Sequence, residues 1–233
     1  MKKSTRTDDL SISVIIPTLN EEKNVAELLK YLKNLDERLE LIVADAGSQD
    51  GTAARARRLS RMIESPRGRG IQMNKGAQAA TGEVLWFLHA DCRPHPDSLP
   101  AMLAALSDPH LVGGGFEYNL DHPSRRFRWT EFFSNRKNRM LTWLFGDMGI
   151  FVRRPVFERM GGYKEIPLME DMDFSKRLKE EGNIVILPLR INTSARRWLE
   201  EGYIYHSIRS WVLQSAWRLG ASPETLARFY TFK

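Results

Sequence analysis

The first half of the chain alternates short apolar runs with stretches in which apolar residues recur every three or four positions. Continuous runs rich in β-branched residues predict buried strands, and they cover 12–16, 39–44, 61–63 and 84–88. The helical spacing predicts helices over 21–35, 51–59 and 72–80. Strands that alternate with helices in this way favour right-handed βαβ units and a largely parallel sheet.

The second half has a less regular pattern. It predicts strands at 111–118, 149–152 and 184–187, and helices at 97–106, 123–145, 155–160, 169–181 and from Trp198 to the end of the chain. Within 123–145, large apolar residues recur at helical spacing, and we interpret this stripe as the face that packs on the core. It consists of Trp129, Phe132, Phe133, Met140, Trp143 and Leu144.

The composition is that of an ordinary soluble globular protein. Of the 233 residues, 42% are hydrophobic and 27% are charged, which suits one large α/β domain. A single cysteine, Cys92, excludes an internal disulfide and suits a reducing compartment. The polar first ten residues predict no secretory signal, and no run of about 18 apolar residues predicts a membrane span. A cytoplasmic location is therefore expected.

The charge balance leaves several partners open. The chain has 35 Lys and Arg against 29 Asp and Glu, which gives a net charge of +6. This excess is compatible with nucleic acid, anionic lipid or a diphosphate substrate, and also with solubility alone.

Three polar segments follow predicted strands, at the carboxyl ends where open α/β sheets bind ligands. Pro17–Glu21 opens a helix, with Asn20 as its expected N-cap. Asp45–Thr52 places an aspartate before a glycine-containing turn, where Asp45 either accepts hydrogen bonds from a nucleoside or caps the turn amides. His89-Ala90-Asp91 offers two ligands that point the same way from extended backbone, suited to Mg²⁺ or Mn²⁺ unless His89 is a core histidine.

Two further segments carry charge at predicted helix starts. Arg67–Gly76 is basic and glycine-rich, which favours a diphosphate or, alternatively, is an ordinary solvated loop. It lacks the spacing of a P-loop. Glu170, Asp171 and Asp173 lie in a first helical turn, where the helix dipole favours the ionised carboxylate that a proton acceptor needs.

Taken together and in order, these segments resemble the family 2 inverting glycosyltransferases. The resemblance covers Ile12 to about Gly182, and it depends on the segments 13–21, 43–52, 74–82, 87–91 and 170–171. A narrower similarity, to a bacterial subgroup linked to arsenosugar biosynthesis, depends on 89–91, 146–151, 168–171 and 194–198. The resemblance implies the GT-A fold, a Rossmann-like three-layer α/β/α sandwich with a mainly parallel mixed sheet and a helical C-terminal extension. We place a polar tail at 1–10, the GT-A domain at 11–200 and the extension at 201–233.

The resemblance also implies roles for individual residues. Asp171 matches the general base, with Glu170 beside it, and Asp91 matches the last residue of the metal motif. His89 stands where most relatives have Asp, which puts the choice between Mg²⁺ and Mn²⁺ in doubt. Contacts with a nucleotide diphosphate sugar, UDP-sugar being favoured, are expected from Pro17, Thr18, Asn20, Glu21, Asp45, Gly47, Arg69, Gln72, Asn74, His89, Ala90 and Asp91.

Weaker expectations concern the acceptor and the partners. Asp147, Met148, Arg196 and Trp198 are candidate acceptor contacts, and His206 is a candidate second metal ligand. The acceptor itself is not defined. Two further interactions stay open: contact of the helix at 123–145 with the inner face of the membrane, and formation of a homodimer. Nucleic acid is not expected as a partner.

The expected reaction is inverting transfer, in which Asp171 accepts the proton of an acceptor hydroxyl. Two other functions stay open. A sugar-nucleotide pyrophosphorylase uses a similar sheet, but its glycine-rich loop follows the first strand, where this chain has Pro17–Glu21. The second open function is a module that binds a nucleotide or nucleic acid and has no transfer activity.

Overall fold

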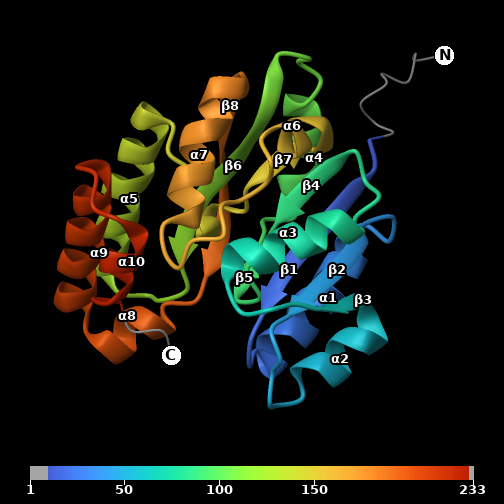
Figure 1. The fold of residues 1–233 in the computed structure, drawn as a ribbon, viewed down its shortest axis with the longest axis horizontal. Helices are drawn as coiled ribbons and strands as arrows, with labels where there is room; N and C mark the ends of the chain where they lie inside the picture. Colours follow the sequence, from blue (N-terminus) through green and yellow to red (C-terminus); the bar gives the residue numbers. More distant parts are fainter. Residues whose placement is uncertain (1–9, 231–233) are drawn as a thin grey trace.

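The computed structural model describes residues 10–230, and its centre is one mixed sheet of eight strands in the order β3-β2-β1-β4-β7-β6-β8-β5 (Figure 1). The strands are β1 (Ile12–Thr18), β2 (Glu40–Asp45), β3 (Arg61–Glu64), β4 (Val84–Phe87), β5 (Cys92–Arg93), β6 (Leu111–Leu120), β7 (Phe151–Arg153) and β8 (Asn183–Thr193). The predicted α/β class with a mainly parallel mixed sheet is confirmed.

The first half of the sheet is parallel, as the sequence predicts. β1 pairs with β2 on one side and with β4 on the other, and β3 adds to β2. β7 then runs antiparallel between β4 and β6, and β6 pairs with β8 in parallel. The carboxyl ends of β1, β2 and β4 therefore lie next to one another, and they carry the three polar segments singled out in the sequence.

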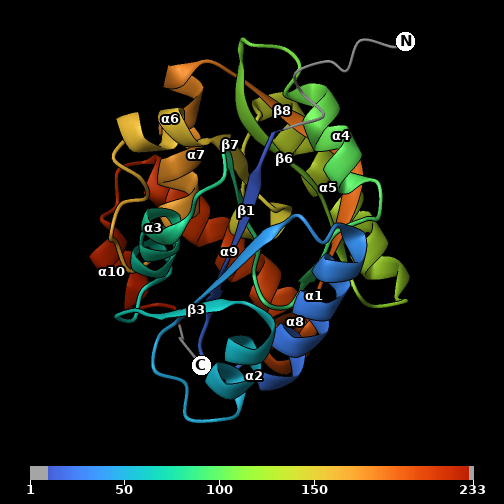
Figure 2. The same ribbon diagram turned by 90° about the vertical axis from the view of Figure 1, so that its right-hand side faces the viewer.

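Helices cover both faces of the sheet because side chains of successive strand residues point to opposite sides. Val14 and Ile16 belong to one core cluster, whereas Ile15 between them belongs to another. The first cluster packs against α1 (Glu22–Leu35), α2 (Thr52–Leu59) and α4 (Ser98–Ala105). The second packs against α3 (Arg69–Ala79), α5 (Arg125–Leu141), α6 (Arg154–Arg159) and α7 (Glu170–Glu181). Figure 2 shows α1 and α4 on one side of β1 and α3, α6 and α7 on the other.

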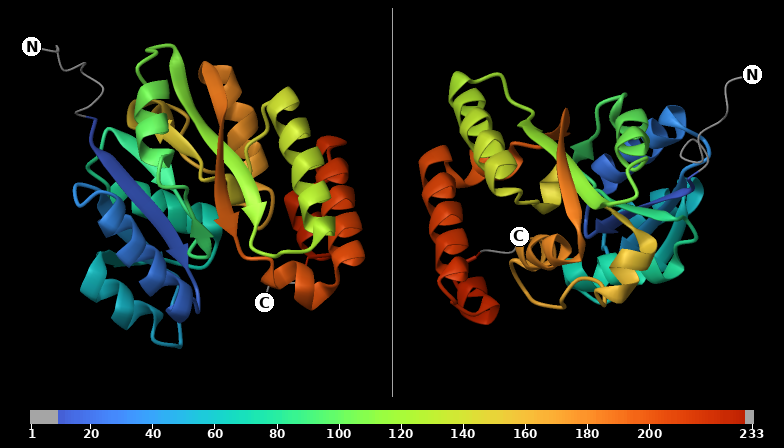
Figure 3. Two further views of the ribbon diagram at one scale, coloured as in Figure 1. Left: turned by 180° about the vertical axis from the view of Figure 1, so that it is seen from behind. Right: turned by 90° about the horizontal axis from the view of Figure 1, so that it is seen from above.

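The C-terminal helices pack on the outside of this sandwich. They are α8 (Arg196–Glu201), α9 (Tyr203–Arg218) and α10 (Pro223–Ala227). A third, smaller core joins Leu168 and Met172 to Leu213 of α9 and Leu226 of α10. The views from the front, from behind and from above place α5 and α9 next to each other, on the side away from β1–β3 (Figures 1 and 3). The proposed division at residue 200 stays a prediction, and residues 1–9 and 231–233 lie outside the described part.

Element limits differ from the sequence predictions at several places: β8 runs to Thr193 rather than Leu187, for example, and β5 was not predicted. α3 begins at Arg69 rather than Gln72. The N-cap of α1 is Glu21, because Asn20 has a left-handed backbone and its side chain accepts from the amide of Gln49 instead. α5 ends at Leu141 rather than Phe145, since Thr142 is left-handed and stops the helix.

The prediction that the apolar stripe of α5 packs on the core is wrong. Trp129, Phe132 and Phe133 are 63%, 58% and 60% exposed, and Met140 is exposed as well. The buried face of α5 carries Phe127 together with three polar residues, Glu131, Asn135 and Asn138. Of the predicted stripe, only the residues after the helix turn inward, with Leu144 fully buried and Trp143 partly buried.

Candidate functional site

The carboxyl ends of β2 and β3 border a pocket of about 510 Å³. The turn after β2 forms one wall, and its shape depends on the buried carboxylate of Asp45. Oδ1 of Asp45 accepts from the hydroxyls of Thr18 and Ser48 at 2.9 and 2.6 Å. Oδ2 accepts from the amides of Gly47 and Ser48 at 3.1 and 2.9 Å. These four bonds use the four lone-pair positions of a carboxylate, so the structure favours the turn-capping reading of Asp45 over a direct nucleoside contact.

Several other residues predicted to contact the donor have their polar atoms engaged within the protein. The side-chain amide of Gln72 donates to the carbonyls of Thr18 and Ala44 and thereby ties α3 to the ends of β1 and β2. Asn74 exchanges two hydrogen bonds with the backbone of Tyr163. Ala90 is buried in the core. Donor contact by Gln72, Asn74 and Ala90 stays a prediction, and the role that the structure shows for Gln72 and Asn74 is to hold neighbouring backbone. Pro17 and Gly47 lie at the open end of the same strands, half-buried and exposed respectively.

Arg69 begins α3, and its guanidinium points across to the start of α7. Its Nη1 lies 3.6 Å from Oε1 of Glu170, whose side chain is buried. Burial raises the pKa of Glu170 to about 7, although the positive charge of Arg69 opposes the rise. The same cation also acts on Asp171, Asp147 and Asp91. One arginine therefore faces a group of four carboxylates.

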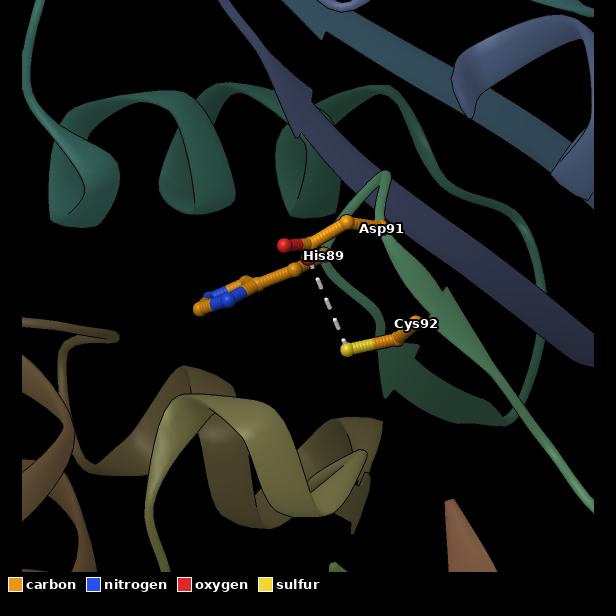
Figure 4. Close-up of side chains that lie close together, drawn as sticks. All are labelled: His89, Asp91 and Cys92. Atoms are coloured by element: carbon orange, nitrogen blue, oxygen red, sulfur yellow. Dashed lines mark hydrogen bonds between the residues drawn. The ribbon is translucent and has the colours of Figure 1, made fainter. Parts of the chain in front are cut away.

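His89, Asp91 and Cys92 form a cluster directly after β4 (Figure 4). Their potential ligand atoms lie within 4.8 Å of one another, and among residues 10–230 this is the group that could hold a metal ion. Burial lowers the pKa of His89 to about 3, and Arg69 and Arg197 act in the same direction, so the imidazole is neutral and has a lone pair to donate. Burial raises the pKa of the Cys92 thiol, which contacts the hydroxyl of Thr193 at 3.2 Å. A protonated thiol is a poor ligand, so His89 and Asp91 fit a divalent cation best.

Asp171 is held in the first turn of α7 and faces this cluster. Its Oδ2 accepts from the amide of Gly146 at 2.9 Å, and its Oδ1 from that of Met172 at 2.7 Å. A Cβ atom added to Gly146 would come within 2.7 Å of the His89 ring and 3.6 Å of Oδ2 of Asp171. The missing side chain of Gly146 is thus what allows the imidazole and the aspartate to approach each other. Met169, just before this turn, has a left-handed backbone with a φ of 67°, a strained conformation for a non-glycine residue.

Electrostatic coupling connects Asp171 to Asp147. Burial raises the pKa of Asp147 to about 7, and the charge of Asp171 contributes to the rise. Burial likewise raises the pKa of Asp171, against the amide of Gly146 and the charge of Arg69. A carboxylate with a raised pKa is a stronger proton acceptor, provided that it is ionised.

The candidate acceptor residues separate into two groups. Arg196 is exposed and forms an ion pair with Glu21 at 3.2 Å, which joins α8 to the start of α1 beside the site. Asp147 is partly buried near Asp171. Met148 is fully buried, and Trp198 packs against the rings of Phe127 and His206. Acceptor contact by either residue stays a prediction.

His206 does not join the metal-capable cluster. Its Nδ1 lies 2.7 Å from Oε2 of Glu201, and its ring packs at a tilt on Trp198. Metal binding by His206 stays a prediction, and the contacts that the structure shows for it are with the C-terminal helices.

Three residues near the site were not singled out as site residues by the sequence: Cys92, Gly146 and Tyr230. The hydroxyl of Tyr230 contacts Arg197, which acts on His89, and it also interacts with Arg69. Cys92 was visible as the neighbour of Asp91, but nothing in the local sequence around Tyr230 indicates that the end of the chain returns to the start of α3.

A metal-capable pair after β4, the carboxylate of Asp171 beside it and a pocket at the ends of β2 and β3 mark this edge of the sheet as the candidate site. Comparison with known proteins identifies the family. Residues 13–160 match the family described as glycosyl transferase family 2, and the chain belongs to that family. The fold is the GT-A fold.

Two curated relatives show the range of the family. The glycosyltransferase AglE of Haloferax volcanii is 27% identical over 188 residues, which cover 73% of this chain and 62% of the relative. The glucosyl-3-phosphoglycerate synthase of Mycolicibacterium smegmatis is 35% identical over 120 residues, which cover 45% of this chain and 40% of the relative. The chain thus spans less than two thirds of the length of either relative.

Among solved structures, the mannosyltransferase PcManGT of Pyrobaculum calidifontis, in complex with GDP-Man and Mn²⁺, has a TM-score of 0.68. The match has 22% identity and covers 92% of this chain and 66% of that chain. The glucosyl-3-phosphoglycerate synthase of Mycobacterium tuberculosis, with Mn²⁺, UDP and its product, has a TM-score of 0.58 at 22% identity, covering 79% and 71%. Separately, no helix within residues 10–230 is long and apolar enough to cross a membrane.

The first prediction concerns Asp45. Asp45→Asn replaces an acceptor oxygen by a donor that faces other donors, so the free energy of unfolding should fall by about 1–3 kcal/mol. Urea denaturation measures it, with Asp97→Asn, an exposed aspartate, as the control. Wild-type stability together with a large loss of donor affinity would show that Asp45 contacts the donor directly.

Proposed function

We propose that this chain transfers a sugar from a nucleotide diphosphate donor to an acceptor hydroxyl, with inversion at the anomeric carbon and with Asp171 as the general base. The observation that supports the proposal best is the approach of Asp171 and His89 to the same point beside Gly146. A metal-capable pair would face the diphosphate there, and a proton acceptor would face the incoming hydroxyl, within one site.

The position of Asp171 suits a general base. Two backbone amides fix both of its oxygens, and each oxygen retains a lone pair for the proton of the acceptor. As the acceptor oxygen attacks the anomeric carbon, its proton passes to Asp171 and the bond to the diphosphate oxygen breaks. Arg69 lies within reach of this group of acids, and its positive charge would stabilise the charge that develops on the leaving diphosphate.

The pocket beside β2 and β3 is the proposed site of the nucleoside. The turn that Asp45 holds lines it, together with Glu64 at the end of β3 and Arg67 beyond that strand. We favour a UDP-sugar because the glucosyl-3-phosphoglycerate synthase with the same fold has UDP in its structure. GDP-sugar is the alternative, since the mannosyltransferase of the same fold is in complex with GDP-Man.

A divalent cation would be held by His89 and Asp91. When bound, it would neutralise charge on the donor diphosphate. An imidazole suits Mn²⁺ better than Mg²⁺, which prefers oxygen ligands, and we therefore propose a preference for Mn²⁺. The narrower similarity to arsenosugar-associated transferases, and a homodimer, stay predictions.

The metal preference can be measured by thermal unfolding with UDP and either cation. At a given concentration, a ligand that binds the native state more tightly raises the unfolding midpoint more, so Mn²⁺ with UDP should raise it more than Mg²⁺ with UDP. His89→Asp should raise the response to Mg²⁺, whereas Cys92→Ser should leave the order unchanged. Equal responses to both cations in the wild type and in His89→Asp would contradict His89 as a metal ligand. A rise in the midpoint with GDP but not with UDP would replace UDP-sugar by GDP-sugar as the proposed donor.

The role of Asp171 predicts a selective loss of turnover. Asp171→Asn keeps one oxygen for the amide of Gly146 but cannot accept the proton, so kcat should fall by about 10²- to 10⁴-fold. Donor affinity, measured by calorimetry, should stay close to the wild-type value. Glu180→Gln, an exposed change on the same helix, is the control. A variant with wild-type turnover would exclude Asp171 as the base.

The pH profile tests the coupling of Asp171 to Arg69. Turnover requires an ionised base, so it falls as the pH drops through the pKa of Asp171, which burial has raised. The charge of Arg69 lowers this pKa. Arg69→Gln removes the charge, and the acid limb of the kcat profile should therefore move to higher pH.

The control for the pH profile is Arg58→Gln, which changes an exposed arginine on α2. It should leave the acid limb where the wild type has it. An acid limb that stays in place in Arg69→Gln, or that moves to lower pH, would show that Arg69 does not act on the catalytic carboxylate.

A further inference from the structure

The outer face of α5 is apolar although it contacts solvent. Phe132, Phe133 and Met140 follow Trp129 by three, four and eleven residues, so all four side chains lie along one side of the helix. All four are more than half exposed. The opposite side of the helix packs on β6 and β8. The sandwich therefore leaves an aromatic surface uncovered.

α9 adds a second exposed apolar face. Ile204, Tyr205, Ile208 and Trp211 are 58–68% exposed, and Val212 is exposed as well. The two helices run side by side in the same direction. Tyr203 at the start of α9 contacts Thr130 and Phe127 of α5, and Trp217 near its end packs on Trp143 just beyond α5. α5 and α9 together thus form one layer at the edge of the molecule (Figure 3).

Basic residues surround these apolar side chains. α5 contains six Lys and Arg but a single acid, Glu131, which is buried and paired with Arg128. Arg125 and Arg136 share the aromatic side of the helix, and both are exposed. α9 contains no acidic residue. The layer is therefore apolar and strongly positive at once.

A groove of about 440 Å³ lies on the same surface. Two arginines and two aromatic residues line it, Arg125, Arg128, Trp129 and Phe132. The guanidinium of Arg128 is engaged by Glu131 and by the carbonyls of Leu120 and His122. Arg125 is exposed, and its guanidinium can bind phosphate oxygens in a bidentate manner, with the aromatic rings as apolar area beside it. A phosphate with an attached hydrocarbon chain matches this combination.

We propose that α5 and α9 form a docking surface for an anionic phospholipid bilayer. Helices that lie on a membrane combine Trp, Phe and Leu with Lys and Arg, and the basic residues interact with anionic headgroups. Aromatic side chains of Trp and Tyr favour the region between headgroups and hydrocarbon. The proposal depends on this surface and not on the transfer reaction.

The charge of the surface argues against a second copy as the occupant. In a two-fold symmetric contact the same patch meets itself, so Arg125 and Arg136 would face basic residues of the other copy without acidic partners on either helix surface. An anionic bilayer supplies the opposite charge across the whole layer. The exposed aromatic residues then enter the apolar boundary.

The surface adjoins the transfer site through α8. Trp198 of α8 packs on Phe127 of α5, and Arg196 of α8 pairs with Glu21 at the edge of the site. A membrane that contacts α5 and α9 would thus lie on the α8 side of the site.

Vesicle co-sedimentation tests the proposal with the full chain. We expect the protein to bind vesicles of three parts phosphatidylcholine and one part phosphatidylglycerol, more weakly at high salt, and to bind pure phosphatidylcholine less. Arg125→Gln with Arg136→Gln should weaken binding by roughly 30-fold, because each basic side chain near an anionic surface contributes about a factor of five. Lys30→Gln with Lys33→Gln, two exposed lysines on α1, should have no such effect.

The aromatic residues have their own test. Trp129→Ser with Trp211→Ser should abolish vesicle binding and leave thermal stability and turnover on a water-soluble acceptor unchanged, because both side chains are exposed. Binding to vesicles that neither pair of changes weakens would overturn the proposal. So would a concentration-dependent dimer in sedimentation velocity that Trp129→Ser with Trp211→Ser dissociates, since the surface would then join two copies.

Discussion

The site depends on one electrostatic constraint, the gathering of four carboxylates around the guanidinium of Arg69. Asp91 follows β4, Asp147 lies in the short turn before β7, and Glu170 and Asp171 begin α7. Buried like charges repel one another strongly because the local dielectric is low. Arg69 offsets part of this repulsion, and a divalent cation on Asp91 would offset more. The arrangement therefore favours ligands that bring positive charge with them, as a diphosphate with its metal ion does.

The framework around this site is built from buried hydrogen bonds that use up polar side chains. Asp45 shapes the turn after β2, Gln72 joins the ends of β1 and β2 to α3, and Asn74 fixes the segment at Tyr163. These residues stand in the family motifs, and their side chains form hydrogen bonds within the protein. They position the ends of β1 and β2 and the start of α3, whereas His89 and Asp171 approach each other beside Gly146.

The sequence predicts the parallel half of the fold well because each signal there is local. Apolar runs give the strands, and the carboxyl-end rule then identifies Asp45, His89 and Asp91 as neighbours. It predicts less about the remaining site for physical reasons. Gly146 matters only because the ring of His89 lies where its side chain would be, and Tyr230 reaches Arg69 across most of the length of the chain. Neither contact leaves a pattern in adjacent residues.

α5 buries its polar face and exposes its aromatic face, which shows what helical periodicity alone does not determine. Helical spacing reveals that a helix has two different faces, but it does not say which one is buried. The final stretch of β6 requires partners for backbone groups, and α5 provides them: Asn135 bonds both backbone groups of Tyr118, and Glu131 accepts from the amide of Leu120. An unpaired buried backbone group costs about as much as several buried methylene groups gain. The polar face therefore turns inward to satisfy the strand, and Trp129 with its neighbours is left outside, where a bilayer would supply the apolar environment that the core does not.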